Sequence, residues 1–288
     1  MRIKPLAFDS LGTRSMSTYV HTKDVSILID PGVELAPKRF GLPPHPLEYK
    51  QKIKHWSEIE KHASMSDVLI ITHYHYDHYN PDKPGIFKDK IALIKNPEDH
   101  INSSQKRRAR AFLPDLKKYA KEVNYADGKT FKYGDTIIEF SNPVPHGSDT
   151  KMGWVVEVAI SNGDKTFVHT SDVEGPTRDD QLSFILSHNP EVVIIDGPAT
   201  YLMGYAVSKS DLEKAKKRIK AILDLDSVKT VVVDHHFLRE KEWHDRIIDL
   251  FSYAKKLNKK VMPAATFVGE KVNILEARRK ELYGGEGK

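Results

Sequence analysis

The chain has 288 residues, enough to bury a sizeable core, and it contains no cysteine. Disulfides, thiolate zinc sites, iron–sulfur clusters and thiol nucleophiles are therefore excluded, so any metal must be held by nitrogen and oxygen ligands. The 45 basic and 40 acidic residues give a formal net charge of +5. This balance is compatible with anionic substrates but is weak evidence for nucleic-acid binding.

The start of the chain, residues 1–5, lacks an apolar signal core. No apolar run approaches the roughly 20 residues that a membrane-spanning helix needs. We therefore expect a cytoplasmic protein without a membrane partner. We also expect residues 1–288 to form one layered α and β domain.

Two short β-branched strands are predicted over residues 25–29 and 67–71, and each leads into a polar turn. Asp30 follows the first strand. Three histidines and one aspartate follow the second strand within six positions: His73, His75, Asp77 and His78. Alternation along an extended chain places His73 and His75 on one side, while the turn directs Asp77 and His78 toward a second ion. Such a cluster indicates metal binding and suits zinc, with iron or manganese as alternatives.

Residues 97–122 are predicted to be helical and basic, and we interpret them as an insertion in the domain. Their run Lys106-Arg107-Arg108-Ala109-Arg110 would either grip phosphates or form a solvated helix face. A strand over residues 135–140 leads to His146. A hairpin turning at Ser161-Asn162-Gly163-Asp164 then has a second strand that leads to Asp172.

The last third of the chain alternates strands with amphipathic helices. A helix over residues 210–225 is predicted to begin with a Ser210–Glu213 capping box. The strand over residues 229–233 ends at Asp234-His235-His236, and neighbouring side chains on an extended segment point to opposite sides. Only one of the two histidines is therefore expected to be a ligand. A helix over residues 243–257 and a closing strand over 260–268 complete the chain.

The order of these polar residues resembles the five-motif signature of the metallo-β-lactamase superfamily: Asp30, His73, His75, Asp77, His78, His146, Asp172 and His235. The resemblance covers most of the chain. Within the superfamily, it is most similar to an archaeal group of uncharacterised proteins that share an opening like residues 10–16 and a fifth motif like Asp234-His235-His236. The resemblance implies an αβ/βα four-layer sandwich, with two sheets back to back and helices outside.

The resemblance also implies two divalent metal ions, expected to be zinc, in a cleft along one sheet edge. Their ligands would fall into three groups: His73, His75 and His146 for the first ion, Asp77, His78 and His235 for the second, and Asp172 between them. Asp30 would orient a ligand, and Asp77 would also accept a proton from a shared water. His236 is the alternative to His235, and the imidazole that is not a ligand would protonate the leaving group or contact substrate.

The implied activity is that of a dinuclear metal-dependent hydrolase, in which a metal-bound hydroxide attacks an ester-like bond. A phosphodiester or another anionic substrate is expected, either a small molecule or a nucleic acid. The absence of cysteine and of a Gly-x-Ser-x-Gly elbow agrees with a mechanism that needs no protein nucleophile.

Two other classes stay open at this point. One is an iron-dependent oxidoreductase or dioxygenase on the same fold, although His75 stands where the di-iron, flavin-linked branch is expected to have glutamate. The other is a non-catalytic nucleic-acid-binding or scaffold protein. The sequence identifies neither the natural substrate nor the oligomeric state.

Overall fold

The computed structural model describes residues 1–205 and 207–284. Within these residues the strands form two main sheets, of six and seven strands, and one two-stranded ribbon. The first sheet has the order β1 (Arg2–Phe8), β2 (Met16–His21), β3 (Ser26–Ile29), β4 (Val68–Ile71), β5 (Ile91–Ile94) and β6 (Glu122–Tyr125). The second has the order β15 (Lys260–Met262), β14 (Thr230–Val233), β13 (Val192–Ile195), β12 (Lys165–His169), β11 (Val158–Asn162), β8 (Thr136–Phe140) and β7 (Thr130–Tyr133). The ribbon pairs β9 (Val144–Pro145) with β10 (Trp154–Val155).

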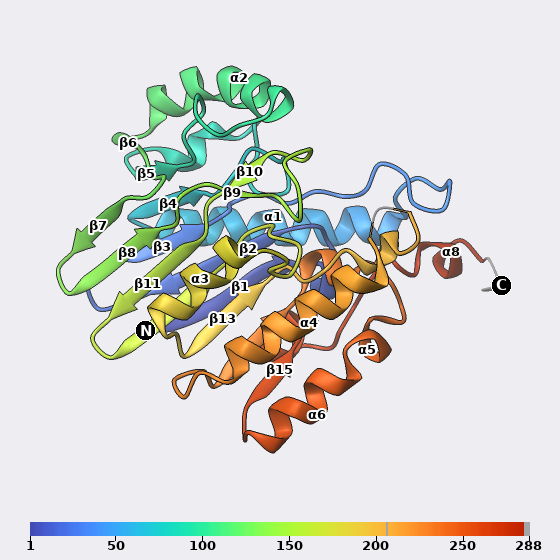
Figure 1. Cartoon of the computed structure of the whole chain (residues 1–288). Coiled ribbons are helices and arrows are strands. Elements are labelled where there is room, and N and C mark those ends of the chain that lie inside the picture. The colour runs from blue at the N-terminus through green and yellow to red at the C-terminus, as the bar shows by residue number, and fades with distance from the viewer. Residues whose placement is uncertain (206, 285–288) are drawn as a thin grey trace.

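Helices cover the outer faces of both sheets (Figure 1). The first sheet carries α1 (Pro46–Met65) and α2 (Ser103–Tyr119), and the second carries α3 (Asp179–His188), α4 (Lys209–Leu223) and α6 (Ile248–Lys256). The shorter helices are α5 (Trp243–Arg246), α7 (Ala264–Phe267) and α8 (Arg279–Leu282), and the 3-10 turns are η1 (Asp9–Leu11), η2 (Pro84–Phe87), η3 (Thr200–Leu202) and η4 (His235–Arg239). The layers therefore follow the order helix, sheet, sheet, helix.

The apolar strands supply both faces of each sheet because side chains alternate along a strand. In β4, Val68 and Ile70 pack into the core between the two sheets, while Leu69 and Ile71 face α1 and α2. In β13, Ile194 joins the inner core and Val193 packs against the helices of the second sheet. Burial of each such side chain contributes about 2 kcal/mol relative to exposure. These two-sided hydrophobic strands fix the register of the segments that follow them.

The strands that matter for function run in parallel. β3, β4 and β5 are parallel neighbours in the first sheet, and β12, β13 and β14 are parallel neighbours in the second. The carboxyl ends of parallel strands meet at one edge of a sheet, so the polar turns that follow them gather there. The predicted hairpin is confirmed, because Asn162 of β11 pairs with Lys165 of β12 across Gly163.

Three local predictions differ from the structure. The helix over residues 243–257 is interrupted at Ile247, whose ψ of 22° is not helical, so that α5 and α6 are separate. The closing strand ends at Met262 because Pro263, which has no N–H to donate, becomes the N-cap of α7. Helix α4 begins at Lys209, one residue before the predicted start, and its capping box joins Ser208 and Asp211 instead of Ser210 and Glu213.

The basic helix predicted near residues 97–122 corresponds to α2, which lies between β5 and β6 in the chain. Its assignment as an insertion, and the assignment of residues 1–288 to one domain, stay predictions, and residues 285–288 lie outside the described part. Among the described residues, no helix combines the length and apolar character that crossing a bilayer requires.

Candidate metal centre

The site is built around Asp172, whose side chain is 1% exposed and follows strand β12. Three imidazole nitrogens point to its Oδ2 atom: Nε2 of His146 at 3.2 Å, of His73 at 3.6 Å and of His236 at 3.7 Å. Two others point to its Oδ1 atom: Nε2 of His78 at 3.2 Å and of His235 at 3.6 Å. Histidine nitrogens therefore lie close to both oxygens of the Asp172 carboxylate.

These side chains form overlapping groups whose donor atoms lie within 4.8 Å of one another. The groups are His73, His75, His146 and Asp172; Asp77, His78 and His235; and Asp172, His235 and His236. The structure therefore brings together every residue that the sequence assigned as a ligand. The first two groups also match the two ligand sets expected from the resemblance, with Asp172 beside both.

Several donor atoms in the centre are buried and have no hydrogen-bond partner within the described residues: His73 Nε2, His78 Nε2 and Asp172 Oδ1. A buried polar atom without a partner costs about 1–3 kcal/mol. Three such atoms in one buried centre are explained if divalent cations are the missing partners. Imidazole and carboxylate donors fit zinc, manganese and iron.

Each of three histidines is fixed by a carboxylate on its other ring nitrogen, as is usual for metal-binding imidazoles. His78 Nδ1 lies 2.7 Å from Asp30, His235 Nδ1 lies 2.8 Å from Asp9, and His236 Nδ1 lies 2.8 Å from Asp196. These bonds leave each Nε2 directed at the centre. Asp30 is held in turn by Thr72, whose backbone N–H donates to Oδ1 at 2.9 Å.

His235 and His236 both face the centre, with ring centroids 4.6 Å apart. We expected residues 234–236 to be extended, so that the two rings would point to opposite sides. This expected conformation is wrong. The segment after β14 turns at once into η4, and His235 has a left-handed φ of 46°. This turn places the two rings on different oxygens of Asp172 instead of on opposite sides of a strand.

Four residues at or beside the site have a left-handed backbone conformation. Asp30, Ser171, Glu174 and His235 all have φ between 46° and 57°, a region that non-glycine residues rarely occupy. Such conformations cost of order 1–3 kcal/mol each and persist where the surrounding structure enforces them. Position 32 requires glycine for lack of space. A Cβ there would lie 2.2 Å from the backbone nitrogen of Tyr79, in the loop that carries the histidines.

The electrostatics divide the histidines of the centre: against burial, Asp172 and other carboxylates raise the pKa of His78, His146 and His235, whereas two other histidines stay neutral. Burial lowers the pKa of His75 to about 3 and lowers the pKa of His73 well below its usual value, with neighbouring imidazoles adding to both effects. Both rings are therefore neutral and available as donors at neutral pH. Burial alone would raise the pKa of Asp172, but His78 and His235 outweigh it and lower this pKa well below its usual range.

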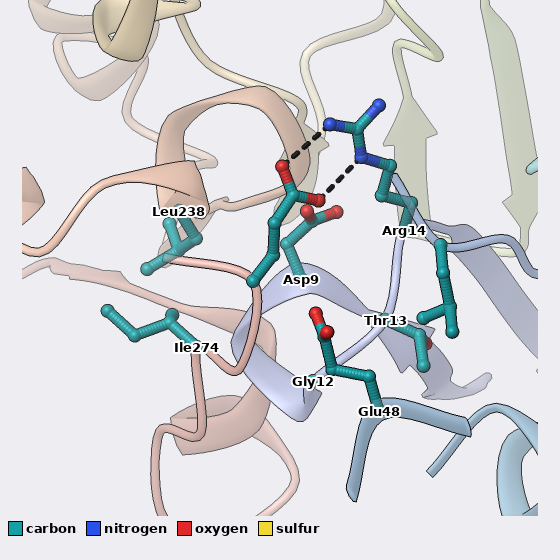
Figure 2. A pocket seen from close by; sticks show the side chains of 9 residues that line it. Asp9, Gly12, Thr13, Arg14, Glu48, Leu238 and Ile274 are labelled. Carbon is teal, nitrogen blue, oxygen red and sulfur yellow. Dashed lines mark hydrogen bonds and ion pairs between the residues drawn. The ribbon is translucent and has the colours of Figure 1, made fainter. Parts of the chain in front are cut away.

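Sequence reasoning missed Asp9, which lies in η1 directly after β1. Its Oδ2 accepts from His235, and its Oδ1 accepts from Arg239 Nε at 3.0 Å. The signal was present, because Asp9 is a polar residue at a strand end like the recognised ligands, but no histidine marks it. Figure 2 shows Asp9 beside Arg14, whose guanidinium binds the Glu276 carboxylate through two bonds of 2.6 Å.

A family model described as "Metallo-beta-lactamase superfamily" matches residues 12–235. The chain belongs to this superfamily. It is 49% identical over 284 residues to a UPF0282 protein of Korarchaeum cryptofilum, covering 98% of this chain and 94% of that one. The family predicted from the motif order is thus confirmed.

Solved structures confirm the metallo-β-lactamase fold. An isothiocyanate hydrolase from Delia radicum gut bacteria superposes with a TM-score of 0.53 at 15% identity, covering 88% of this chain and 94% of that one. CmlA, a diiron β-hydroxylase from Streptomyces venezuelae, superposes with a TM-score of 0.51 at 14% identity, covering 91% of this chain and 52% of that one. At these identities the similarity concerns the fold, and the αβ/βα sandwich expected from the sequence is confirmed.

Proposed function

We propose that this metallo-β-lactamase-fold chain is a dinuclear metal-dependent hydrolase of an ester-like bond in an anionic substrate, with a phosphodiester as the first choice. The observation that carries the proposal is the two-sided arrangement at Asp172. Nitrogen donors approach both of its oxygens, and donor atoms on both sides are buried without partners among the described residues. One bridging carboxylate between two donor sets is the arrangement that two-metal hydrolysis requires.

The donor sets fit two ions: His73, His75 and His146 for the first, Asp77, His78 and His235 for the second, and Asp172 for both. When bound, such a pair of cations supplies Lewis-acid stabilisation and brings the pKa of a shared water toward neutrality. The protein's own part is to hold the ligands rigidly. Asp9, Asp30 and Asp196 do this by binding the far nitrogen of three imidazoles.

Asp77 is the residue we assign to proton transfer. Its Oδ2 lies 3.6 Å from His235 Nε2 and 3.8 Å from Arg239 Nη2, so the carboxylate is held between two positively polarised groups. Their pull, together with that of His78, outweighs burial and lowers the pKa of Asp77. Asp77 is thus ionised at neutral pH, but the lowered pKa makes it a weak base, so its assignment as proton acceptor depends on the position of Oδ2. His236, with its Nε2 on the other side of Asp172, would contact the substrate or its leaving group.

Contacts made by helix α2 favour a small anionic substrate over a long nucleic acid. Lys106 and Arg110 are both paired with Glu98, at 2.6 and 3.3 Å. Arg108 donates to the backbone oxygen of Tyr74 at 3.2 Å and stacks over the Tyr76 ring. Much of the basic run therefore has internal partners, which weakens its case as a phosphate-binding lid.

The proposal is tested by measuring metal content and hydrolysis of bis(p-nitrophenyl) phosphate on the same sample prepared without chelator. We expect two metal ions per chain and turnover that a chelator abolishes. His73→Ala should lose both metal and turnover. His100→Ala, which changes an exposed histidine, is the matched control and should retain both.

The other outcomes each contradict part of the proposal. Two ions without phosphodiester turnover would contradict this substrate and direct the search to lactones or thioesters. Tightly bound iron with oxygen consumption would favour the oxidoreductase reading, as in the diiron relative of the same fold. Turnover that survives in His73→Ala would contradict catalysis at this centre.

A further inference from the structure

A second pocket lies close to the metal centre and is not part of it. It has a volume of about 270 Å³ and is lined by residues from four parts of the chain, among them Arg39, Phe40, Tyr201 and Lys280. Tyr201 belongs to η3 after β13, and Lys280 belongs to α8. This size suits part of a small molecule and exceeds what a bare inorganic ion needs.

Arg39 is a half-buried cation of this pocket, and its charge is only partly compensated. Its guanidinium lies 4.7 Å from the ring centres of both Phe40 and Tyr201, so two aromatic rings hold it in place. One nitrogen donates to the backbone oxygen of Arg239 at 3.1 Å, but its buried Nε has no hydrogen-bond partner in the described part of the chain. Burial lowers the pKa of Arg39, as expected for an incompletely paired cation.

The nearest acid does not neutralise Arg39. Glu276 lies 3.9 Å from its Nε, but both oxygens of that carboxylate already bind Arg14 at 2.6 Å (Figure 2). Three acids line the pocket; Glu242 is exposed to solvent, and the other two are engaged by cations. Glu240 binds Arg246 at 3.1 Å, and Glu281 binds Lys241 at 2.8 Å.

Two more features favour an anion in the pocket. The Lys280 ammonium lies 5.2 Å from the Phe40 ring centre, which adds a second positive charge near Arg39. The planar guanidinium of Arg39 carries its N–H groups in a fork, and the Phe40 and Tyr201 rings already hold this fork in place. Such a fork binds carboxylates and phosphates with little further loss of entropy.

The pocket is linked to the metal centre through one residue. Arg239 Nη1 lies 3.4 Å from the Tyr201 hydroxyl, and Arg239 Nη2 lies 3.8 Å from Asp77 Oδ2. A ligand group held beside Tyr201 would therefore lie next to the buried Arg239 side chain, whose other terminal nitrogen faces Asp77. This spacing suits the two ends of one substrate.

We propose that the pocket beside Arg39 binds a terminal oxyanion of the substrate, a phosphate or carboxylate that is not the group hydrolysed. The assignment of this anion to the substrate rests on the proposed hydrolase function, but anion binding in the pocket does not. The organic body joined to the oxyanion would occupy the rest of the 270 Å³. Arg39 then acts as a specificity residue, and Lys280 supplements its charge.

The test uses isothermal titration calorimetry on the metal-loaded protein. The three ligands are phenyl phosphate, benzoate and the neutral analogue benzyl alcohol. We expect the two anions to bind and the alcohol not to bind, and the tighter of the two anions identifies the preferred oxyanion. Arg39→Gln should weaken anion binding by about tenfold or more, because a hydrogen bond to a charged group is lost. Lys280→Gln should weaken it less, and its exposed position keeps folding intact.

Arg107→Gln, which removes an exposed cation on α2, is the control and should leave binding unchanged. Metal content is measured in every variant and should not change. Anion binding that is insensitive to both pocket variants would overturn the proposal, and its loss on metal removal alone would place the anion on the metals. Failure of the hydrolase proposal looks different, since anion binding would then persist without turnover.

Discussion

At the scale of single residues, the centre depends on carboxylates that do not face the metal positions. Asp9 illustrates this, because it binds His235 through one oxygen and Arg239 through the other while remaining 5% exposed. Arg239 in turn lies beside Asp77. One buried carboxylate therefore orients a ligand and the guanidinium next to the proposed proton acceptor.

Replacing Asp9 should affect the second metal more than the first. Asp9→Asn preserves shape but removes the charge that fixes His235 and Arg239, so we expect the second ion to bind about 10–100-fold more weakly. Competition with a graded chelator measures the two affinities. Asp115→Asn, on the exposed face of α2, should leave both unchanged. Equal affinities in Asp9→Asn and the parent would show that Asp9 has no positioning role.

At the scale of elements, the start of α4 shows how a cap is selected. The sequence offers two serines, Ser208 and Ser210, each followed three residues later by an acid. The structure uses the first: Asp211 N donates to Ser208 Oγ at 3.1 Å, and Ser208 N donates to Asp211 Oδ2 at 3.1 Å. Both boxes satisfy the sequence rule, so the choice depends on where the preceding loop reaches the helix.

Alanine substitutions distinguish the two serines. Ser208→Ala should destabilise the protein by about 1 kcal/mol, because the first turn loses its cap. Ser210→Ala lies inside the helix on an exposed surface and should cost close to nothing or stabilise slightly. Urea unfolding of both variants measures the difference. A larger loss in Ser210→Ala would contradict the observed cap.

The elements also show what could be predicted from sequence and what could not. The strands over residues 25–29 and 67–71 and the ligand cluster after β4 follow from local patterns, since β-branched runs and histidine spacing are read within a few residues. The convergence of His235 and His236 depends on a left-handed turn, and sequence alone favoured an extended segment. Arg39 and Tyr201 meet only through tertiary structure, so no local pattern could pair them.

At the scale of the whole molecule, buried neutral histidines connect stability to pH. His55 on α1 is 4% exposed and lies 2.6 Å from Thr13 Oγ1, joining the helix to the start of the chain. Burial, with a smaller effect of Lys54, lowers its pKa from 6.5 to about 4. Between pH 6.5 and pH 4 the His55 imidazole is therefore mostly protonated in the unfolded chain but mostly neutral in the folded protein.

This contribution to stability is present above pH 6.5 and is lost as the pH falls from 6.5 toward 4, by about 3 kcal/mol in total. His55→Gln should therefore lose less stability than the parent between pH 7 and pH 4.5, even if it is less stable at pH 7. Urea unfolding at several pH values measures this slope. His100→Gln, an exposed control, should keep the slope of the parent. Parallel slopes for His55→Gln and the parent would contradict burial of a neutral imidazole.

We expect two ions to flank Asp172, and anomalous diffraction from crystals of the metal-loaded protein detects them directly. We predict two anomalous peaks about 3.5–4 Å apart, as in two-metal sites generally. One peak should lie near His73, His75 and His146, and the other near Asp77, His78 and His235. A single peak, or peaks away from Asp172, would contradict the dinuclear centre.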